Sequence, residues 1–321
     1  MTEIVKTDPT TTALAAPSAE QANPARVYVA SLGTKGGRRV MWQSLDKIAR
    51  MISNGDMDAG TLPWYALRFS HVAAIRARLA EDLAPATVNR MLSALRGTLR
   101  AAWRLGQMDA EDYHRAIDVR PVKGETIPAG RALDASELGA LMATCADDKT
   151  PAGVRDAAML GVLYVGGLRR AEVAGLDLAD YDASTGELRV MGKGHKERIA
   201  WLAGGAALAL ADWLGIRGDA AGPLFWAIGK GGDLRPGRLS SQAVYVLCRK
   251  RGNAAGLDTF TPHDLRRTFV GDLLDAGADI ATVQKMAGHA SPTTTARYDR
   301  RPEATKRDAA RLLTMPYVRR E

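Results

Sequence analysis

Apolar residues recur at three- and four-residue steps through the first third of the chain, a pattern typical of amphipathic helices. The clearest stripe follows Pro85 and consists of Val88, Met91, Leu92, Leu95, Leu99, Ala102 and Trp103. We expect Gly106 to end this helix, because glycine readily adopts the left-handed conformation found at helix C-termini. Residues 1–25 are rich in Thr, Ala and Pro without such a period, which predicts a flexible tail. The pattern therefore predicts a helical domain over residues 26–118.

Residues 119–130, VRPVKGETIPAG, hold two prolines and two glycines and lack an apolar period, as linkers do. A second domain is expected over residues 131–321. Helical patterns start there near Ser136, run through 157–164, and resume after Ser241, after Pro262, over 280–286 and after Pro292. Two strand-like runs, 187–191 and 198–202, flank a glycine-containing turn. The predicted fold class is mainly α, with a small β-hairpin or three-stranded sheet in the second domain.

The composition fits an ordinary globular chain of about two domains, with 321 residues, 46% of them hydrophobic and 25% charged. No stretch approaches the ~18 apolar residues of a membrane span, and the N-terminus does not resemble a signal sequence, so we expect a cytoplasmic protein without membrane contact. Cys145 and Cys248 are expected to be reduced, unreactive thiols in the core. The net charge of +8 favours an anionic partner.

Positive charge is densest in residues 26–130, which hold 16 basic and 10 acidic side chains. Arg96, Arg100 and Arg104 are spaced by four and therefore share one face of the helix after Pro85, with Arg90 on the same helix. This ridge is either a solvated helix face or a surface that follows phosphates. A second basic cluster, Arg249, Lys250 and Arg251, lies near the end of another predicted helix.

The five histidines form no H-E-x-x-H and join no cysteine pair, and the sequence has no Gly-rich phosphate loop or dinucleotide fingerprint. We therefore expect neither a metal nor a cofactor. His263 and Arg266 lie three apart near a helix start, so both project from one face. A guanidinium beside an imidazole suits a phosphate better than a metal cation.

Several segments together resemble the tyrosine recombinase, or phage integrase, family, in particular its Xer-like two-domain branch. They are LYVGGLRRAE at 163–172, GKGHKER at 192–198, HDLRRTF at 263–269, AGH at 287–289, and Tyr298. Their order and spacing match the family throughout residues 131–301. Gly166 and Ala171 depart from residues that are common there, but neither is at a catalytic position.

The resemblance implies a site-specific DNA recombinase that cuts and rejoins strands through a 3′-phosphotyrosine, without metal or ATP. Tyr298 would be the nucleophile, Arg169 and Arg266 would hold the phosphate oxygens, and Lys193 would protonate the leaving oxygen. His263 would assist proton transfer from Tyr298, and His289 would hydrogen-bond the phosphate or the nucleophile. The residues before the linker would form a helical DNA-binding domain ahead of the catalytic one, with the arginine ridge as its DNA face. The cluster at 249–251 could reach the major groove of the DNA or its backbone.

The implied partner is double-stranded DNA, with self-association into a tetramer on it, and a second recombinase or accessory protein remains open. A predicted helix at 302–313 would pack either within its own chain or on a neighbour. Two alternatives are a type IB topoisomerase-like enzyme and a catalytically silent DNA-binding protein of the same fold. The complete set of six polar residues argues against the silent protein. The sequence does not indicate the target DNA sequence or the direction of recombination. It also does not distinguish integration from excision or dimer resolution.

Overall fold

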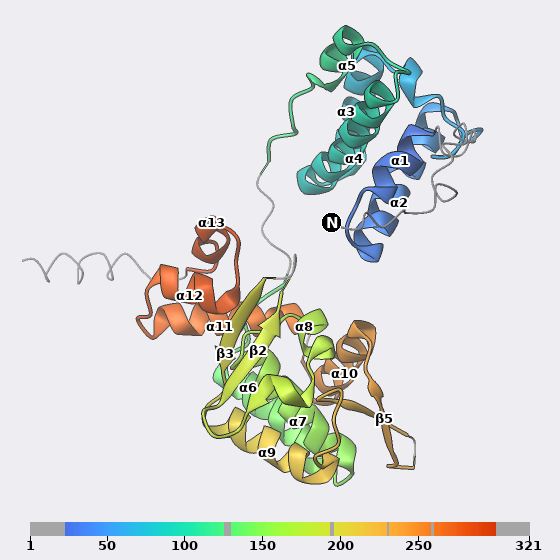
Figure 1. Ribbon diagram of the computed structural model, residues 1–321. Helices are drawn as coiled ribbons and strands as arrows, with labels where there is room; N and C mark the ends of the chain where they lie inside the picture. The colour runs from blue at the N-terminus through green and yellow to red at the C-terminus, as the bar shows by residue number, and fades with distance from the viewer. Residues whose placement is uncertain (1–22, 125–129, 193–195, 230, 258–259, 300–321) are drawn as a thin grey trace, which may run out of the picture. The chain divides into compact units, whose positions relative to one another are not determined.

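The computed structural model describes residues 23–124, 130–192, 196–229, 231–257 and 260–299. The chain divides into two compact units, residues 1–128 and 129–321. The first unit consists of helices alone in its described part (Figure 1). They are α1 (Pro24–Ala30), α2 (Lys35–Ile52), the short 3₁₀ turn η2 (Trp64–Ala66), α3 (Phe69–Asp82), α4 (Pro85–Arg104) and α5 (Ala110–Ile117). Because α1 begins at Pro24, the predicted tail is too long by two residues.

The long helix α4 is the centre of the first unit. Pro85 occupies its first turn, where the missing N–H costs nothing, and Gly106 follows its end with φ of +71°. The apolar stripe predicted from the sequence is buried, except for Trp103, which is 37% exposed. The stripe packs with the buried faces of α2 and α3 into one core. The helical period therefore determines which side of α4 lies inside.

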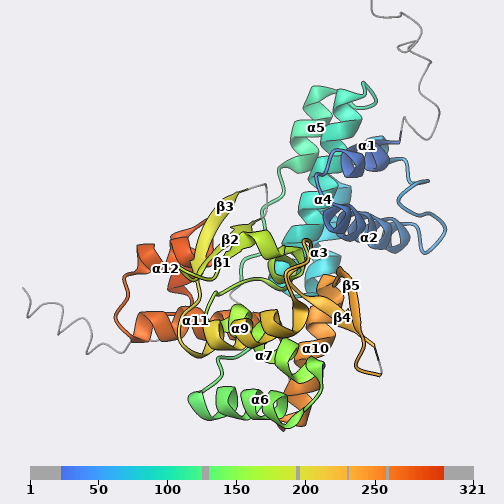
Figure 2. The ribbon, with the colours of Figure 1, turned by 60° about the horizontal axis from the view of Figure 1, so that its bottom comes forward.

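The second unit contains eight helices in its described part and two small sheets (Figures 1 and 2). Its helices are α6 (Ala135–Asp147), α7 (Pro151–Tyr164), α8 (Arg170–Gly175), α9 (Gly205–Arg217), α10 (Ser241–Ala254), α11 (Pro262–Asp275), α12 (Ile280–Ala287) and α13 (Pro292–Ala296), with a 3₁₀ turn η3 (Leu178–Asp180). The helix predicted after Ser241 is capped one residue earlier, by Ser240.

The sheet predicted at 187–202 is three-stranded and antiparallel, in the order β1 (Tyr181–Asp182), β2 (Glu187–Met191), β3 (Glu197–Trp201). Glu187 pairs with Trp201 and Met191 with Glu197, so β2 and β3 form the expected hairpin. A second pair, β4 (Trp226–Ile228) and β5 (Leu234–Arg238), forms a separate two-stranded sheet. The mainly α fold class with a small sheet is confirmed.

The core of the second unit lies between α7, β2, α9 and α10. Cys145 and Cys248 are buried there as free thiols, and burial raises the pKa of both. A smaller cluster joins α11 to α12 around Phe269 and Val283. Figure 1 shows α11, α12 and α13 grouped together beside the β2–β3 hairpin. Four of the six candidate catalytic residues, His263, Arg266, His289 and Tyr298, lie on or directly after the helices of this group.

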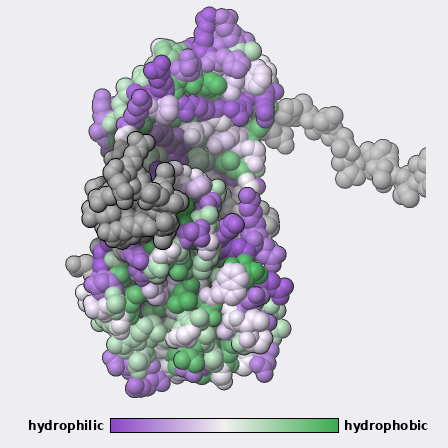
Figure 3. All heavy atoms as spheres, turned by 90° about the vertical axis from the view of Figure 1, so that its left-hand side faces the viewer, coloured by the Kyte–Doolittle hydropathy of each residue, from purple (hydrophilic) through white to green (hydrophobic). Residues whose placement is uncertain are grey.

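Apolar residues are also found on the surface of the second unit. Figure 3 shows them gathered toward its lower end, at the level where α9 lies in Figure 1, whereas the first unit is mainly hydrophilic on that face. Leu208 of α9 is 69% exposed and Trp201 of β3 is 48% exposed. No helix within the described ranges is long and apolar enough to cross a membrane.

Candidate active site

Arg169 is held at the start of α8 by the carboxylate of Glu172. Its backbone N–H donates to Glu172 Oε2 and its Nη1 to Oε1, both at 2.8 Å. Its Nη2 donates to the carbonyl of Gly288, just after α12, at 3.1 Å. Burial alone would raise the pKa of Glu172, but hydrogen bonds from Arg198 and Arg169 lower it. Glu172 therefore remains ionised and fixes the guanidinium of Arg169.

Arg266 lies on the first turns of α11 and is only 2% exposed. Its guanidinium donates to the backbone carbonyls of Gly167 and Ala287. Gly167 has φ of +59°, and a Cβ there would lie 2.3 Å from the Phe269 ring, so only glycine fits this turn. Burial, followed by repulsion from Arg169, lowers the pKa of Arg266 to about 9. The side chain is still cationic at neutral pH.

Proline and a capping box place His263 at the start of α11. Pro262 takes the first helical position, and Asp264 accepts hydrogen bonds from the N–H and hydroxyl of Thr261, at 2.9 and 2.7 Å. Asp264 also accepts from the N–H of Arg131 at 3.0 Å. This carboxylate therefore anchors the chain entering the second unit and the start of α11.

The hydroxyl of Tyr298 lies 3.4 Å from His263 Nε2. Tyr298 follows α13 and packs partly against the cluster that joins α11 and α12. The guanidinium carbon of Arg267 lies 5.4 Å from the centre of the Tyr298 ring, within the range of a cation–π interaction. The Tyr298 ring is therefore half-buried, with its hydroxyl facing a histidine and an arginine over its ring.

His289 follows Gly288, which ends α12 in the left-handed conformation. Its Nδ1 lies 2.9 Å from the hydroxyl of Thr295, and its ring centre is 6.1 Å from that of Tyr298. Burial, then the charges of Arg266 and Arg169, lower the pKa of His289 to about 4. Burial, followed by the positive charge of Arg266, lowers the pKa of His263 below its usual value of 6.5. Both imidazoles are therefore neutral at pH 7 and can accept protons.

Five of the six predicted catalytic residues lie together where the starts of α8 and α11 meet the segments that follow α12 and α13. In the sequence, Arg169 and Tyr298 are 129 positions apart. Arg169, His263 and Arg266 line one cavity of about 490 Å³. Lys193, the sixth, lies outside the described residues. No group of three or more potential metal-ligating side chains is found in the described part of the chain.

Arg198 on β3 also belongs to this constellation, although sequence reasoning did not select it. Its Nη2 lies 2.8 Å from Glu172 Oε2, and its Nε donates to the carbonyl of Met286 at 3.1 Å. It therefore links the hairpin to the carboxylate that holds Arg169 and to the end of α12. The GKGHKER segment contained the residue, but its partners lie 26 and 88 positions away.

The basic ridge expected on α4 is only partly free. Arg96 donates to the backbone carbonyls of Ile117 and Val119, and Arg100 Nε donates to the Tyr113 hydroxyl at 3.1 Å. Arg90, Arg100 and Arg104 are exposed. Two of the four arginines thus help to hold α5 and the segment after it, and the role of the ridge in DNA binding stays a prediction.

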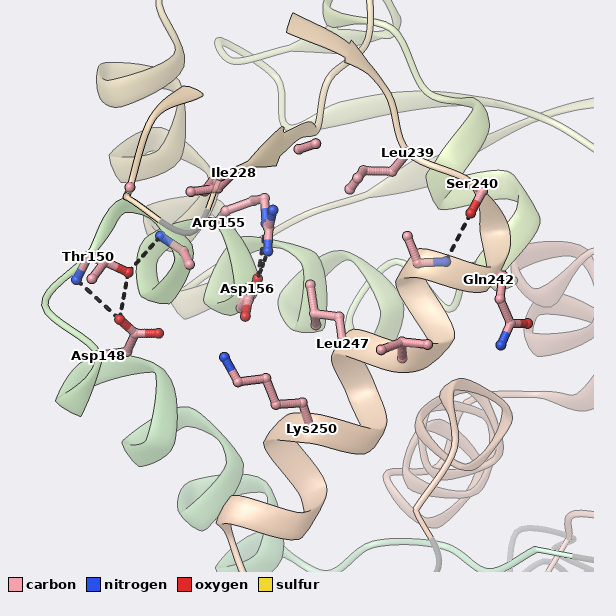
Figure 4. A pocket seen from close by; sticks show the side chains of 16 residues that line it. Asp148, Thr150, Arg155, Asp156, Ile228, Leu239, Ser240, Gln242, Leu247 and Lys250 are labelled. Carbon is pink, nitrogen blue, oxygen red and sulfur yellow. Dashed lines mark hydrogen bonds and ion pairs between the residues drawn. The ribbon is translucent and has the colours of Figure 1, made fainter. Parts of the chain in front are cut away.

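The three basic side chains near the end of α10, Arg249, Lys250 and Arg251, point in three different directions. Arg251 is a correction to the prediction: it is 4% exposed and paired with Asp156 at 2.8 Å and Asp148 at 2.6 Å, so it cannot reach DNA. Figure 4 shows Lys250 pointing into a cavity of about 730 Å³ that Arg155 and Asp148 also line. Arg249 is half-buried, one turn after Tyr245.

Comparison with known proteins gives consistent matches. The model of the phage integrase family matches residues 131–304. Tyrosine recombinase XerC of Actinobacillus pleuropneumoniae is 35% identical over 188 residues, which are 57% of this chain and 60% of that protein. Tyrosine recombinase XerC of Chromohalobacter salexigens is 34% identical over 262 residues, which are 80% of this chain and 83% of that protein.

The fold matches a solved recombinase of low sequence similarity. The Tn1549 transposon integrase in complex with a circular intermediate DNA aligns with a TM-score of 0.64 at 16% identity, over 92% of this chain and 99% of that one. The family match spans more than half of the 321 residues, and the named relatives favour site-specific recombination over the two alternatives. The chain therefore belongs to the phage integrase family, as a tyrosine recombinase of the Xer type.

Proposed function

We propose that this chain breaks and rejoins DNA strands at a specific site, with Tyr298 as the nucleophile. The observation that carries the proposal is the 3.4 Å approach of the Tyr298 hydroxyl to His263, beside the guanidiniums of Arg169 and Arg266. A phenol attacks a phosphodiester only if a base accepts its proton and cations offset the charge that develops on phosphorus. This site offers both kinds of group.

In the proposed step, the Tyr298 oxygen forms a bond to phosphorus and the bond to the 5′ oxygen of the next nucleotide breaks. The neutral His263 accepts the phenolic proton, and the two arginines hold the non-bridging oxygens. The product is a 3′-phosphotyrosine, which conserves the energy of the phosphodiester, so that rejoining by a 5′ hydroxyl requires no ATP. Two fixed guanidiniums supply the charge that a divalent metal supplies elsewhere.

His289 and Lys193 complete the proposed set. His289, neutral and oriented by Thr295, would donate a hydrogen bond to a phosphate oxygen through the nitrogen that Thr295 does not use. Lys193, which follows β2 in the sequence, would protonate the leaving 5′ oxygen; this assignment rests on the sequence motif alone.

The proposed partner is duplex DNA, and the complex of the Tn1549 integrase with a circular intermediate DNA supports DNA as the partner. Residues 26–118 would form a DNA-binding domain and residues 131–321 the catalytic domain. We further propose that four copies assemble on two DNA sites and that the chain works in the cytoplasm, where its DNA would lie. Light scattering with and without DNA tests the assembly: a stable tetramer without DNA would contradict it.

The chemistry is tested on nicked duplexes, in which the short cleaved fragment diffuses away and the covalent adduct accumulates. Candidate duplexes come from DNA that flanks this gene and from replicon-resolution sites. The protein is incubated with them in EDTA and run on a denaturing gel. We expect an adduct with the parent and with Tyr65→Phe, an exposed control, and none with Tyr298→Phe. An adduct that survives Tyr298→Phe, or DNA binding without any adduct, would contradict the proposal.

A further inference from the structure

The cavity that holds the catalytic arginines extends beyond them. Besides Arg169, His263 and Arg266, it is lined by Arg170 of α8 and Tyr245 of α10. Its volume of about 490 Å³ is in the range of pockets for drug-sized ligands, which is far more room than one phosphate group fills. The cavity therefore has space for part of the DNA strand on one side of the reacting phosphate.

The lining is strongly positive. Three arginines and one histidine contribute to it, and no carboxylate is among the described residues that line it. Arg169 and Arg266 are already fixed by Glu172 and by backbone carbonyls, as one phosphate clamp requires. Arg170 is therefore a third cation in the same cavity, beyond the two that the chemistry of one phosphate needs.

Within the described part of the chain, no hydrogen bond or ion pair takes up the donors of the Arg170 guanidinium. Its side chain is exposed, and its guanidinium carbon lies 5.5 Å from the centre of the Tyr245 ring. In a stacked guanidinium the N–H groups point outward in the plane, away from the ring, so they can still bind an anion. Arg249 lies one turn beyond Tyr245 on the same side of α10, which adds positive charge in the same direction.

We propose that Arg170, supported by Tyr245, binds a second phosphodiester of the cleaved strand, next to the one that Tyr298 attacks. The ligand is a single anionic phosphate linkage, recognised by charge and by the planar donors of the guanidinium, without reading base identity. Tyr245 is a positioning residue, because its ring orients Arg170. The proposal rests on the proposed function, since it assumes that the scissile phosphate occupies the neighbouring clamp.

The test uses the full chain carrying Tyr298→Phe, so that binding is measured without cleavage. Its Kd is determined for the nicked duplex on which the parent forms its adduct. Two further duplexes carry an uncharged methylphosphonate in place of one phosphate, on either side of the scissile linkage. Arg170→Ala is expected to weaken binding of the unmodified duplex about tenfold, and to have no effect on one of the two modified duplexes, because the contacted charge is already gone.

Variants of Tyr245 separate orientation from general structure. The penalty that Arg170→Ala causes on the unmodified duplex, relative to the modified one, measures the contact between Arg170 and the phosphate. Tyr245→Phe keeps the ring and should leave this difference unchanged, whereas Tyr245→Ala should reduce it. Lys250→Ala removes a positive charge that faces the other cavity of α10 and should show equal penalties on all three duplexes. Circular dichroism confirms that each variant is folded, and Arg170→Lys provides a milder change at the same position.

Two failures are distinguishable. Equal penalties of Arg170→Ala on all three duplexes would overturn the second phosphate site while leaving the proposed function intact. Absence of any adduct with the parent chain would instead overturn the proposed function, and the second site with it.

Discussion

The two units use the same residue type, arginine, in opposite ways. In the first unit the arginines of α4 lie at the surface, and their fixed contacts are with backbone carbonyls and the hydroxyl of Tyr113. In the second unit Arg266 and Arg251 are 2% and 4% exposed. A buried cation must be compensated by carboxylates or dipoles, whereas an exposed one is compensated by water. Loss of a buried arginine of the second unit should therefore affect chemistry or folding, whereas loss of an exposed arginine of α4 should affect affinity alone.

The largest contrast is expected at Arg266. In the proposed mechanism Arg266 donates to the charge that develops on phosphorus, so Arg266→Ala should lower adduct formation at saturating DNA by about 10²–10³-fold. Arg90→Ala in the first unit is the control and should leave this rate unchanged. Single-turnover gels measure both, and circular dichroism checks that the variants are folded. A loss below tenfold at Arg266 would contradict its assignment to the phosphate clamp.

Arg251 tests the structural use of a buried arginine. Arg251→Met leaves Asp156 paired with Arg155 alone and Asp148 without an ion-pair partner, which should lower the free energy of unfolding by about 3 kcal/mol. The half-buried Arg249→Met should change it by about 0.5 kcal/mol or less. Thermal or urea unfolding gives both values. A stable Arg251→Met protein with weakened DNA binding would restore the original prediction that this residue contacts DNA.

Arg198 tests positioning within the second unit. Arg198→Met frees Glu172 on one side and the end of α12 on the other, and small displacements of reacting groups cost about 10²-fold in rate. Adduct formation should fall by that order while the Kd for DNA stays within threefold. Arg198→Lys should recover part of the rate. Arg189→Met, at an exposed position on the same hairpin, serves as the control and should match the parent.

In the first unit the expected effect is on the salt dependence of binding. Changing Arg90 and Arg104 together to Gln removes two charges, each of which should contribute about 0.9 to the slope of log K against log salt. The slope should therefore become shallower by nearly 2, with the adduct rate at saturating DNA unchanged. Arg78→Gln, exposed on α3 and paired with Glu81, is the control. An unaltered slope would mean that the ridge is merely a solvated helix face.

The smallest effect is expected from pH near neutrality. In the protein without DNA the pKa of His263 lies below 6.5. More than half of the molecules therefore carry a neutral His263 at pH 6.5, and nearly all of them do at pH 7.5. The second-order rate of adduct formation should therefore change less than twofold across this range and fall at lower pH, as His263 loses its capacity to accept a proton. A rate that rises steeply between pH 6.5 and 7.5 would contradict His263 as the acceptor in this state.

Much of the fold was predictable because its signals are local. Pro85, Pro262 and Pro292 begin helices, Gly288 ends one, and the alternation around 187–201 gives a hairpin. Helix α9 was not predicted, because its apolar residues surround the helix without forming one stripe. The predicted helix at 302–313 lies outside the described residues.

By itself, the sequence determined most of the elements, most of their ends and the order of the polar motifs, because each depends on neighbours within a few positions. Tertiary structure alone decided which arginines are free. Arg251 follows Arg249 and Lys250 in an apparently solvated run, yet its carboxylate partners stand 95 and 103 positions earlier. Arg198 and Tyr245 likewise gain their roles from residues on other elements. Burial and charge pairing are long-range properties, since they depend on which surfaces the packed core brings together.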